Sequence, residues 1–207
     1  MTRIALHHIH IRLVAQQSML FDAWQRQFQD CEMVEVVHGD ILAEETDAIV
    51  SPANSFGYMD GGLDLALSLH FGWHLEKAVR SVLLKEYDGE LPVGQAIIVP
   101  TQHEQIPWLV SAPTMRVPMV VKDTVYAYLA FRAMLRALDR HNSTTSDQPI
   151  RSIACPGLGT GEGQMPAERC ARQMRYAYDV CVEGHLLREG GLASAARNHM
   201  WLIDYEA

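Results

Sequence analysis

Short apolar runs alternate along this chain with longer segments in which apolar residues recur at helical spacing. Strands that alternate with helices are typical of an α/β domain, in which helices cover a sheet. In such folds, ligands bind where loops leave the carboxyl ends of the strands. The expected strands are residues 4–14, 34–37, 48–50, 96–99, 108–111 and 150–155, and the expected helices are residues 16–28, 65–87 with a break near Gly72, 123–138 and 167–182.

The composition limits the class of protein. The chain has 207 residues, 48% of them apolar, so we expect one domain, or one domain with a small appendage. Its 17 basic and 25 acidic residues give a net charge of −8, which argues against tracking a nucleic-acid backbone, because that requires a basic face. The four cysteines show no CxxC spacing, residues 1–8 show neither a long apolar region nor a small-residue cleavage site, and no apolar run approaches a membrane span. We therefore expect a cytoplasmic protein with free thiols and no membrane contact.

The segment from Ser51 to Asp64 joins an apolar strand to a helical pattern through a loop with one proline and three glycines. A strand–loop–helix junction of this kind leaves backbone N–H groups free at the helix start, and these can bind an anion. The same loop carries an amide at Asn54 and a carboxylate at Asp64. The pattern indicates a phosphate-bearing ligand, with chemistry on that ligand as a further possibility.

A second loop has glycine at every second position: Gly157, Gly159, Gly161 and Gly163. Neither a strand nor a helix needs that spacing, whereas a loop that brings its backbone against a ligand does. The loop fits neither the GxGxxG dinucleotide fingerprint nor the GxxxxGK phosphate loop. A flexible surface turn is the alternative, but its place between a strand and a helix favours anion binding.

Five short motifs occur in order around these loops. Residues 39–41 and 47–50 resemble the opening strand pair of the macro domain, and residues 51–54 (Ser-Pro-Ala-Asn) stand where that family has Asn-Ala-Ala-Asn. Residues 59–64 (Met-Asp-Gly-Gly-Leu-Asp) stand where it has four Gly, Val and Asp. Two further segments resemble its Pro-x-Gly-x-Ala motif and its Pro-Ala-Ile-Ser-Thr-Gly loop; they are residues 92–96 and 156–166. Over roughly residues 34–182 the chain therefore resembles the macro domain, an ADP-ribose-binding fold.

The resemblance implies an α/β fold, a three-layer α-β-α macro domain with a mixed central sheet. We assign residues 34–183 to this domain, 1–33 to an N-terminal strand–helix extension packed on it, and 184–207 to a weakly helical tail. The family usually ends on a strand that is not evident here. The strand over residues 4–14 is a candidate to fill an edge of the sheet in its place.

The resemblance also implies a role for each site residue. Asp40 would accept a hydrogen bond from the adenine amino group, with help from the backbone of Ile41. Asn54 and Asp64 would face the distal ribose and position an attacking water, and Glu162 is a second candidate carboxylate. The pyrophosphate would lie between two sets of loop residues: Gly61, Gly62 and Leu63 on one side, and Gly159, Thr160, Gly161, Glu162 and Gly163 on the other.

Three functions remain open. The first is an enzyme that hydrolyses an ADP-ribose conjugate, such as a mono-ADP-ribosyl ester or O-acetyl-ADP-ribose. The second is a non-catalytic ADP-ribose reader, and the third is an interaction module with a degenerate pocket. The polar pair has structural alternatives too, since Asp64 could cap a helix and Asn54 could hold its own loop. We expect no cofactor and no metal; the expected partner is ADP-ribose or an ADP-ribosylated substrate, with nucleic acid involved only as such a substrate.

Overall fold

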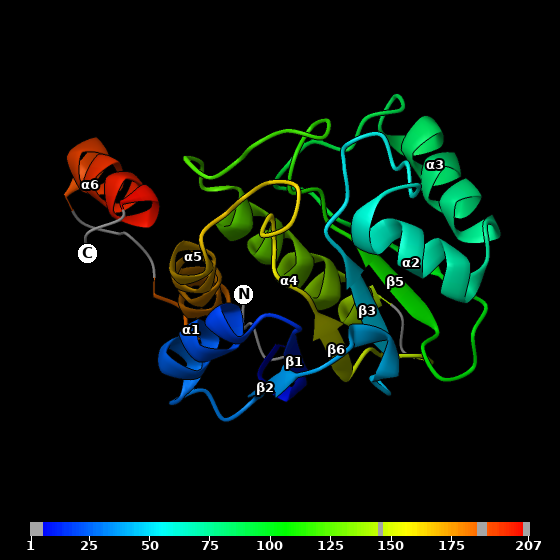
Figure 1. Ribbon diagram of the computed structural model, residues 1–207, viewed down its shortest axis with the longest axis horizontal. Helices are drawn as coiled ribbons and strands as arrows, with labels where there is room; N and C mark the ends of the chain where they lie inside the picture. The colour runs from blue at the N-terminus through cyan, green and yellow to red at the C-terminus, as the bar shows by residue number, and fades with distance from the viewer. Residues whose placement is uncertain (1–5, 145–146, 186–189, 205–207) are drawn as a thin grey trace.

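A six-stranded mixed sheet forms the centre of the protein in the computed structural model, which describes residues 6–144, 147–185 and 190–204 (Figure 1). The strand order is β2-β1-β6-β3-β5-β4. The strands are β1 (His10–Ala15), β2 (Val34–His38), β3 (Ala48–Ser51), β4 (Ile97–Pro100), β5 (Trp108–Ser111) and β6 (Ser152–Cys155).

The direction of the strands decides where a ligand site can form. The strands from β2 to β5 in this order pair in parallel, and β4 pairs with β5 in the antiparallel sense. The carboxyl ends of the five parallel strands therefore meet at one edge of the sheet. The predicted mixed sheet is confirmed, and this edge is where a binding site is expected in an α/β fold.

Strand β1 lies inside the sheet. Its residue Ile11 pairs with Val34 of β2 on one side and with Ile153 of β6 on the other. The prediction that the N-terminal strand fills an edge is therefore wrong. The edge prediction rests on the missing final strand of the family, whereas in the structure β1 pairs on both sides. Its residue Arg12 is accommodated on an interior strand by an ion pair to the buried Glu44 at 2.6 Å. Of the expected strand over residues 4–14, residues 4 and 5 lie outside the described part of the chain, and residues 6–8 form a 3-10 turn.

Helices cover both faces of the sheet. Helices α1 (Ser18–Phe28), α4 (Tyr126–Thr144) and α5 (Ala167–Cys181) pack against one face. Helices α2 (Gly62–Phe71) and α3 (His74–Glu86) pack against the other (Figure 1). This is the predicted three-layer arrangement.

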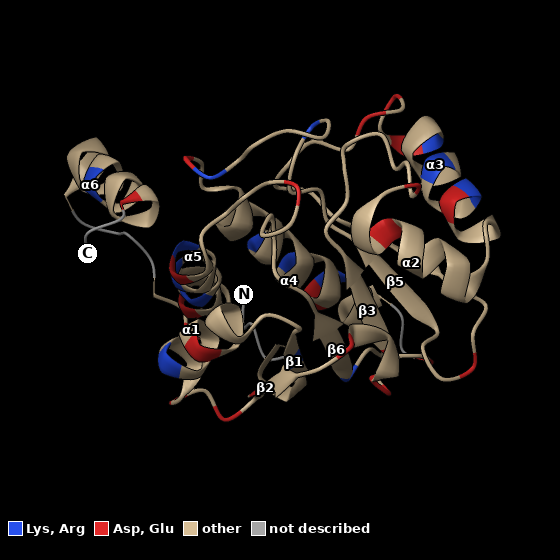
Figure 2. Ribbon diagram, in the orientation of Figure 1, with Lys and Arg blue, Asp and Glu red and all other residues tan. Residues whose placement is uncertain are grey.

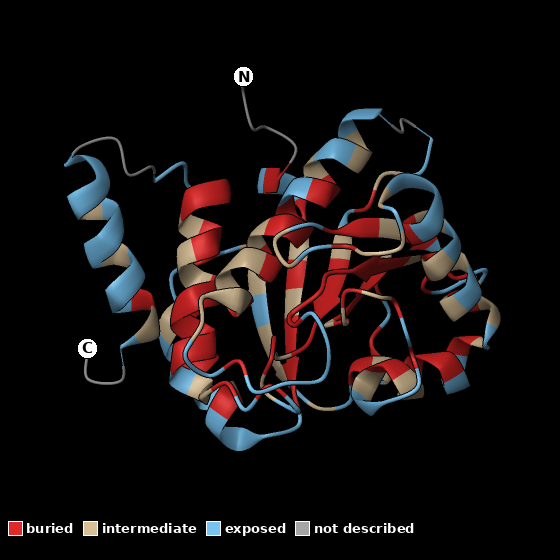
Figure 3. Cartoon of the chain, turned by 90° about the horizontal axis from the view of Figure 1, so that it is seen from above, coloured by how far each residue is buried: buried red, intermediate tan, exposed pale blue. Residues whose placement is uncertain are grey.

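The alternation of side chains along the strands explains the two cores. In β3, Ala48 and Val50 point into the core shared with α1, α4 and α5, whereas Ile49 points into the core shared with α2 and α3. All four residues of β3 are buried, as expected for a parallel strand covered on both faces. Figure 2 shows that charged residues lie mainly on the helices and loops, and Figure 3 shows buried residues along the sheet and the inner helix faces.

Two further features agree with the sequence pattern. The expected break in the second helical segment is at Gly72, which has φ = +101° and separates α2 from α3. In the tail, α6 (Gly191–Ile203) contacts α5 and buries Leu202; residues 186–189 and 205–207 of the tail lie outside the described part. Among the described helices, none is both long and apolar enough to cross a membrane.

Candidate ADP-ribose-binding site

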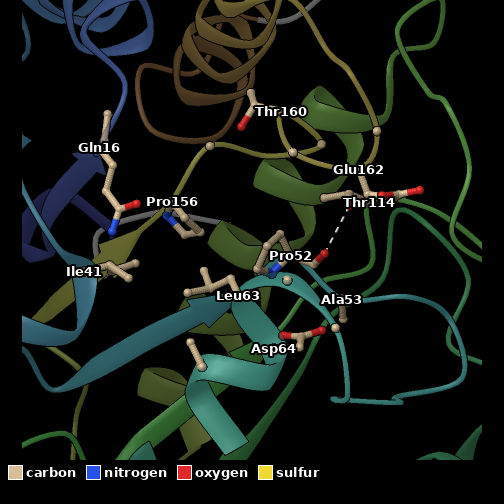
Figure 4. Close-up of a pocket in the computed structure, with 18 of the residues that line it drawn as sticks. Gln16, Ile41, Pro52, Ala53, Leu63, Asp64, Thr114, Pro156, Thr160 and Glu162 are labelled. Atoms are coloured by element: carbon tan, nitrogen blue, oxygen red, sulfur yellow. Dashed lines mark hydrogen bonds between the residues drawn. The ribbon is translucent and has the colours of Figure 1, made fainter. Parts of the chain in front are cut away.

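A cavity of about 810 Å³ opens at the carboxyl edge of the sheet (Figure 4). Loops that follow β1, β2, β3, β5 and β6 surround it. The structure brings every residue predicted for the site to this one cavity. These residues are Asp40, Ile41, Asn54, Gly61, Gly62, Leu63, Asp64, Gly159, Thr160, Gly161, Glu162 and Gly163.

The first glycine loop leads into the start of α2. The N-cap residue is Gly61, which has no side chain to bond the first N–H groups of the helix. The first N–H groups of a helix have no acceptor within the helix, so those of α2 are available to an anion in the cavity. Gly62 has φ = +53°, a conformation that other residues rarely adopt. Glycine at this position lets the backbone turn directly beside the cavity.

The second glycine loop folds tightly upon itself. The carbonyl of Gly159 accepts a hydrogen bond from Met165 N at 2.9 Å, and that of Gly163 accepts one from Val121 N at 2.8 Å. Both donors lie outside the cavity lining, so these carbonyl oxygens are turned away from a bound anion. A Cβ on Gly163 would lie 2.5 Å from the oxygen of Gly159. The close approach of backbone to backbone therefore requires glycine here.

The cavity has no basic side chain among the described residues that line it. Its charged lining residues are the acids Asp40, Asp64 and Glu162. An anionic ligand must therefore be neutralised by backbone N–H groups, which is what two glycine loops at helix starts supply. In Figure 4, Thr160 and Glu162 of the second loop lie across the cavity from Leu63 and Asp64 of α2.

Asp64 is a buried carboxylate in the first turn of α2, with only 7% of its surface exposed. Its Oδ1 accepts a hydrogen bond from Ser51 Oγ at 2.5 Å. Burial raises the pKa of Asp64 from 3.8 to about 6, while the Ser51 hydroxyl acts in the opposite direction and the charge of Asp60 raises it further. A carboxylate with such a pKa, facing a cavity, can exchange a proton near neutral pH.

Asn54 also lines the cavity, but its side chain is committed to its own loop. Its Oδ1 accepts hydrogen bonds from Phe56 N at 3.1 Å and Tyr58 N at 3.4 Å, and its Nδ2 donates to Tyr58 O at 2.8 Å. These bonds form the local turn that asparagine commonly makes. One N–H of the amide remains for a ligand, because the NH₂ group carries two.

The two residues that replace family glycines differ in their surroundings. Met59 is buried in the core beneath α2 and α3, and its backbone N–H donates to Glu76 Oε2 at 2.8 Å. Asp60 is exposed and does not line the cavity. The acid that stands where the family has glycine therefore turns away from the space that an anion would fill.

Asp40 lies at the opposite end of the lining, after β2. Its Oδ1 accepts a hydrogen bond from Leu42 N at 3.0 Å and so caps a short 3-10 turn over Ile41–Ala43. The other carboxylate oxygen of Asp40 is available to a ligand. Ile41 is buried beside it and presents its side chain to the cavity.

The sequence interpretation missed several lining residues. Gln16, Gln17 and Leu20, at the junction of β1 and α1, line the cavity because β1 lies inside the sheet. The available signal is the pair of glutamines between a strand and a helix, but the prediction places that strand at an edge of the sheet. Thr114 and Met115 follow β5, and Thr114 Oγ1 donates to Pro52 O at 3.1 Å (Figure 4). Among the described residues, no group of three or more His, Cys, Asp or Glu is arranged to hold a metal.

Comparison with known proteins identifies the family. The Macro domain profile matches residues 50–174, and the chain belongs to this family. A macro domain-containing protein of Cupriavidus necator is 32% identical over 142 residues, which is 68% of this chain and 76% of that protein. An uncharacterized protein of Aquifex aeolicus is also 32% identical over 142 residues, covering 68% of this chain and 78% of that one.

Solved structures show the same fold. The macrodomain of Mycobacterium tuberculosis DarG aligns with a TM-score of 0.57 at 23% identity, covering 68% of this chain and 86% of that one. The Oceanobacillus iheyensis macrodomain with ADP aligns with a TM-score of 0.53 at 27% identity, covering 66% and 70%. A mutant of that macrodomain with ADPR aligns equally well, at 26% identity.

Proposed function

We propose that this chain binds ADP-ribose in the cavity at the carboxyl edge of the sheet. Two glycine loops face a cavity that has no basic side chain among its described lining residues, an arrangement suited to a pyrophosphate. The family membership supports the same ligand, since a related macrodomain was solved with ADPR and with ADP.

In the proposed pose, ADP-ribose extends from the loop after β2 to the first turn of α2. The free carboxylate oxygen of Asp40 accepts a hydrogen bond from the adenine amino group, next to the backbone of Ile41. The pyrophosphate lies between the start of α2 and the second glycine loop, and the distal ribose reaches Asn54 and Asp64. Glu162, exposed on the second loop, borders this end as a further carboxylate.

We also propose that the protein hydrolyses an ester conjugate of ADP-ribose, such as O-acetyl-ADP-ribose or a mono-ADP-ribosyl ester. The observation that carries this proposal is the buried carboxylate of Asp64, whose pKa is raised to about 6. Asp64 takes a proton from a water as the water oxygen bonds to the ester carbonyl carbon. The ester C–O bond then breaks, and the proton passes to the departing ribose oxygen. A general base with this pKa is mostly ionised above pH 6, so the rate should rise through that pH.

Titration with ADP-ribose tests the binding proposal. A ligand that binds the folded state alone raises the melting temperature, and calorimetry gives its affinity. Binding to the wild type that weakens in Asp40→Ala supports the pose. No heat and no thermal shift at millimolar ADP-ribose would reject the ligand and favour an interaction module with a degenerate pocket.

Turnover by Asp64→Ala tests the hydrolysis proposal. This variant should lose ester hydrolysis and retain ADP-ribose binding, whereas Asp60→Ala, which changes an exposed acid outside the cavity, should retain both. Unchanged turnover in Asp64→Ala would refute the mechanism. The commitment of the Asn54 amide to its own loop favours the second candidate function, a non-catalytic reader. Binding by the wild type without release from any ADP-ribosylated ester would support that reader.

A further inference from the structure

The buried pair of Ser51 and Asp64 places a hydroxyl directly on the carboxylate of the proposed base. Ser51 is the last residue of β3 and is 1% exposed. Its Oγ lies 2.5 Å from Asp64 Oδ1, and it does not line the cavity. Ser51 is therefore shielded from a ligand and can act on one only through Asp64.

The backbone of Ser51 is held by the neighbouring strand β5. It pairs with Ser111 of β5, and its carbonyl accepts a hydrogen bond from Ala112 N at 3.0 Å. The hydroxyl is thus presented from a rigid strand to a carboxylate in the first turn of α2. A short hydrogen bond to an ionised oxygen is stronger than one between neutral groups and fixes the orientation of the acceptor.

We propose that Ser51 is a positioning residue for Asp64: by holding Oδ1, it leaves Oδ2 as the oxygen that faces the cavity and accepts the proton of the attacking water. This inference rests on the proposed hydrolytic function. The bond also favours the ionised form of Asp64, so that Ser51 lowers the pKa that burial raises. The charge of Asp60, on the loop before α2, acts in the opposite direction and raises the pKa of Asp64.

The test compares Ser51→Ala with the matched control Ser55→Ala. Ser55 is also 1% exposed and lies on the loop that follows β3, but its hydroxyl has no hydrogen-bond partner among the described residues. The first measurement is the pKa of the Asp64 carboxyl group, determined by a ¹³C NMR titration of the unliganded protein. We expect this pKa to rise above about 6 in Ser51→Ala, to stay unchanged in Ser55→Ala and to return in Ser51→Thr, which keeps a hydroxyl.

The second measurement is the pH profile of ester hydrolysis. The acidic limb of kcat should move to higher pH in Ser51→Ala, with KM little changed. A rise of one unit from about 6 lowers the ionised fraction of Asp64 at pH 6 about fivefold. A merely structural serine would lower the melting temperature without moving this limb. Ser51→Cys has nearly the same size and a weaker hydrogen-bond donor, so it should also raise the Asp64 pKa and move the acidic limb of kcat to higher pH. This variant provides the same test if Ser51→Ala does not fold.

The outcomes separate this inference from the proposed function. An Asp64 pKa that is the same in Ser51→Ala and the wild type would overturn the positioning role, and so would an equal loss of kcat at every pH in Ser51→Ala and Ser55→Ala. If the wild type hydrolyses no ester, the proposed function fails. The NMR titration still decides in that case whether Ser51 holds the carboxylate.

Discussion

Asp64 should lower the stability of the folded protein at neutral pH, and removing its charge should raise it. Its pKa is about 6 in the folded protein against 3.8 for an unperturbed carboxyl, because burial disfavours the ionised form. The folded state therefore binds more protons than the unfolded state between these two pH values. The contribution of Asp64 to the free energy of unfolding falls as pH rises from about 4 to about 6, and it stays low above that window.

The magnitude follows from the same two values. One pKa unit corresponds to about 1.36 kcal/mol, so the ionisation of Asp64 lowers the free energy of unfolding by roughly 3 kcal/mol above pH 6. Asp64→Asn is neutral at every pH and keeps an oxygen that accepts the Ser51 hydrogen bond. In a domain of this size, 3 kcal/mol corresponds to about 6–12 °C in melting temperature, which is an upper bound for the gain at pH 8.

Thermal unfolding of the wild type and Asp64→Asn from pH 4 to pH 8 provides the assay. The two melting temperatures should be close at pH 4 and diverge through pH 6, with the variant more stable and inactive in ester hydrolysis. Asp60→Asn is the matched control, because its carboxylate is exposed and its loss should change stability by about 0.5 kcal/mol or less. Equal melting temperatures at pH 8, or a difference that does not depend on pH, would refute the reasoning.

Three further predictions concern the loops and the N-terminal unit. Gly163→Ala should lower the free energy of unfolding in a denaturant titration by about 1–3 kcal/mol and weaken ADP-ribose binding, because its Cβ would lie 2.5 Å from the Gly159 oxygen. The control Gly161→Ala, with open space around its Cβ, should unfold like the wild type in the same titration. Asp40→Ala should weaken ADP-ribose about tenfold by calorimetry and lower stability by about 1 kcal/mol, since the Leu42 N–H loses its acceptor. Trp24→Ala should cost about 3–5 kcal/mol in chemical unfolding, because this fully buried side chain of α1 belongs to the main core.

The local patterns in the sequence predict most of the fold because strand and helix periodicities depend on near neighbours. The two glycine loops are visible for the same reason, since their turns need glycine regardless of the rest of the chain. The position of β1 could not be predicted in this way, because it depends on pairing with β6 far along the chain. That error also hid Gln16 and Gln17 from the predicted site.

The chemistry of single side chains depends equally on distant partners. Asp64 and Asn54 are both evident in the loop motif, but the motif does not show that Asp64 bonds Ser51 across the strand end or that Asn54 bonds Tyr58. The outward turn of Asp60 follows from the burial of Met59 beside it. Whether a neighbour is a core residue is a tertiary property, and the loop sequence alone does not contain it.

The interior position of β1 has a consequence for how the protein folds. Ile11 pairs with Ile153, about 140 residues later in the chain, so the middle of the sheet closes only after β6 has been synthesised. Pairings of such large sequence separation carry a high loop-closure entropy and slow the rate-limiting step. A nascent chain would expose β1 and the unpaired edge of β3 until then, and this is when it most needs protection from aggregation. The two glycine loops also come together only at this last step, so the chain should gain ligand binding at the end of folding.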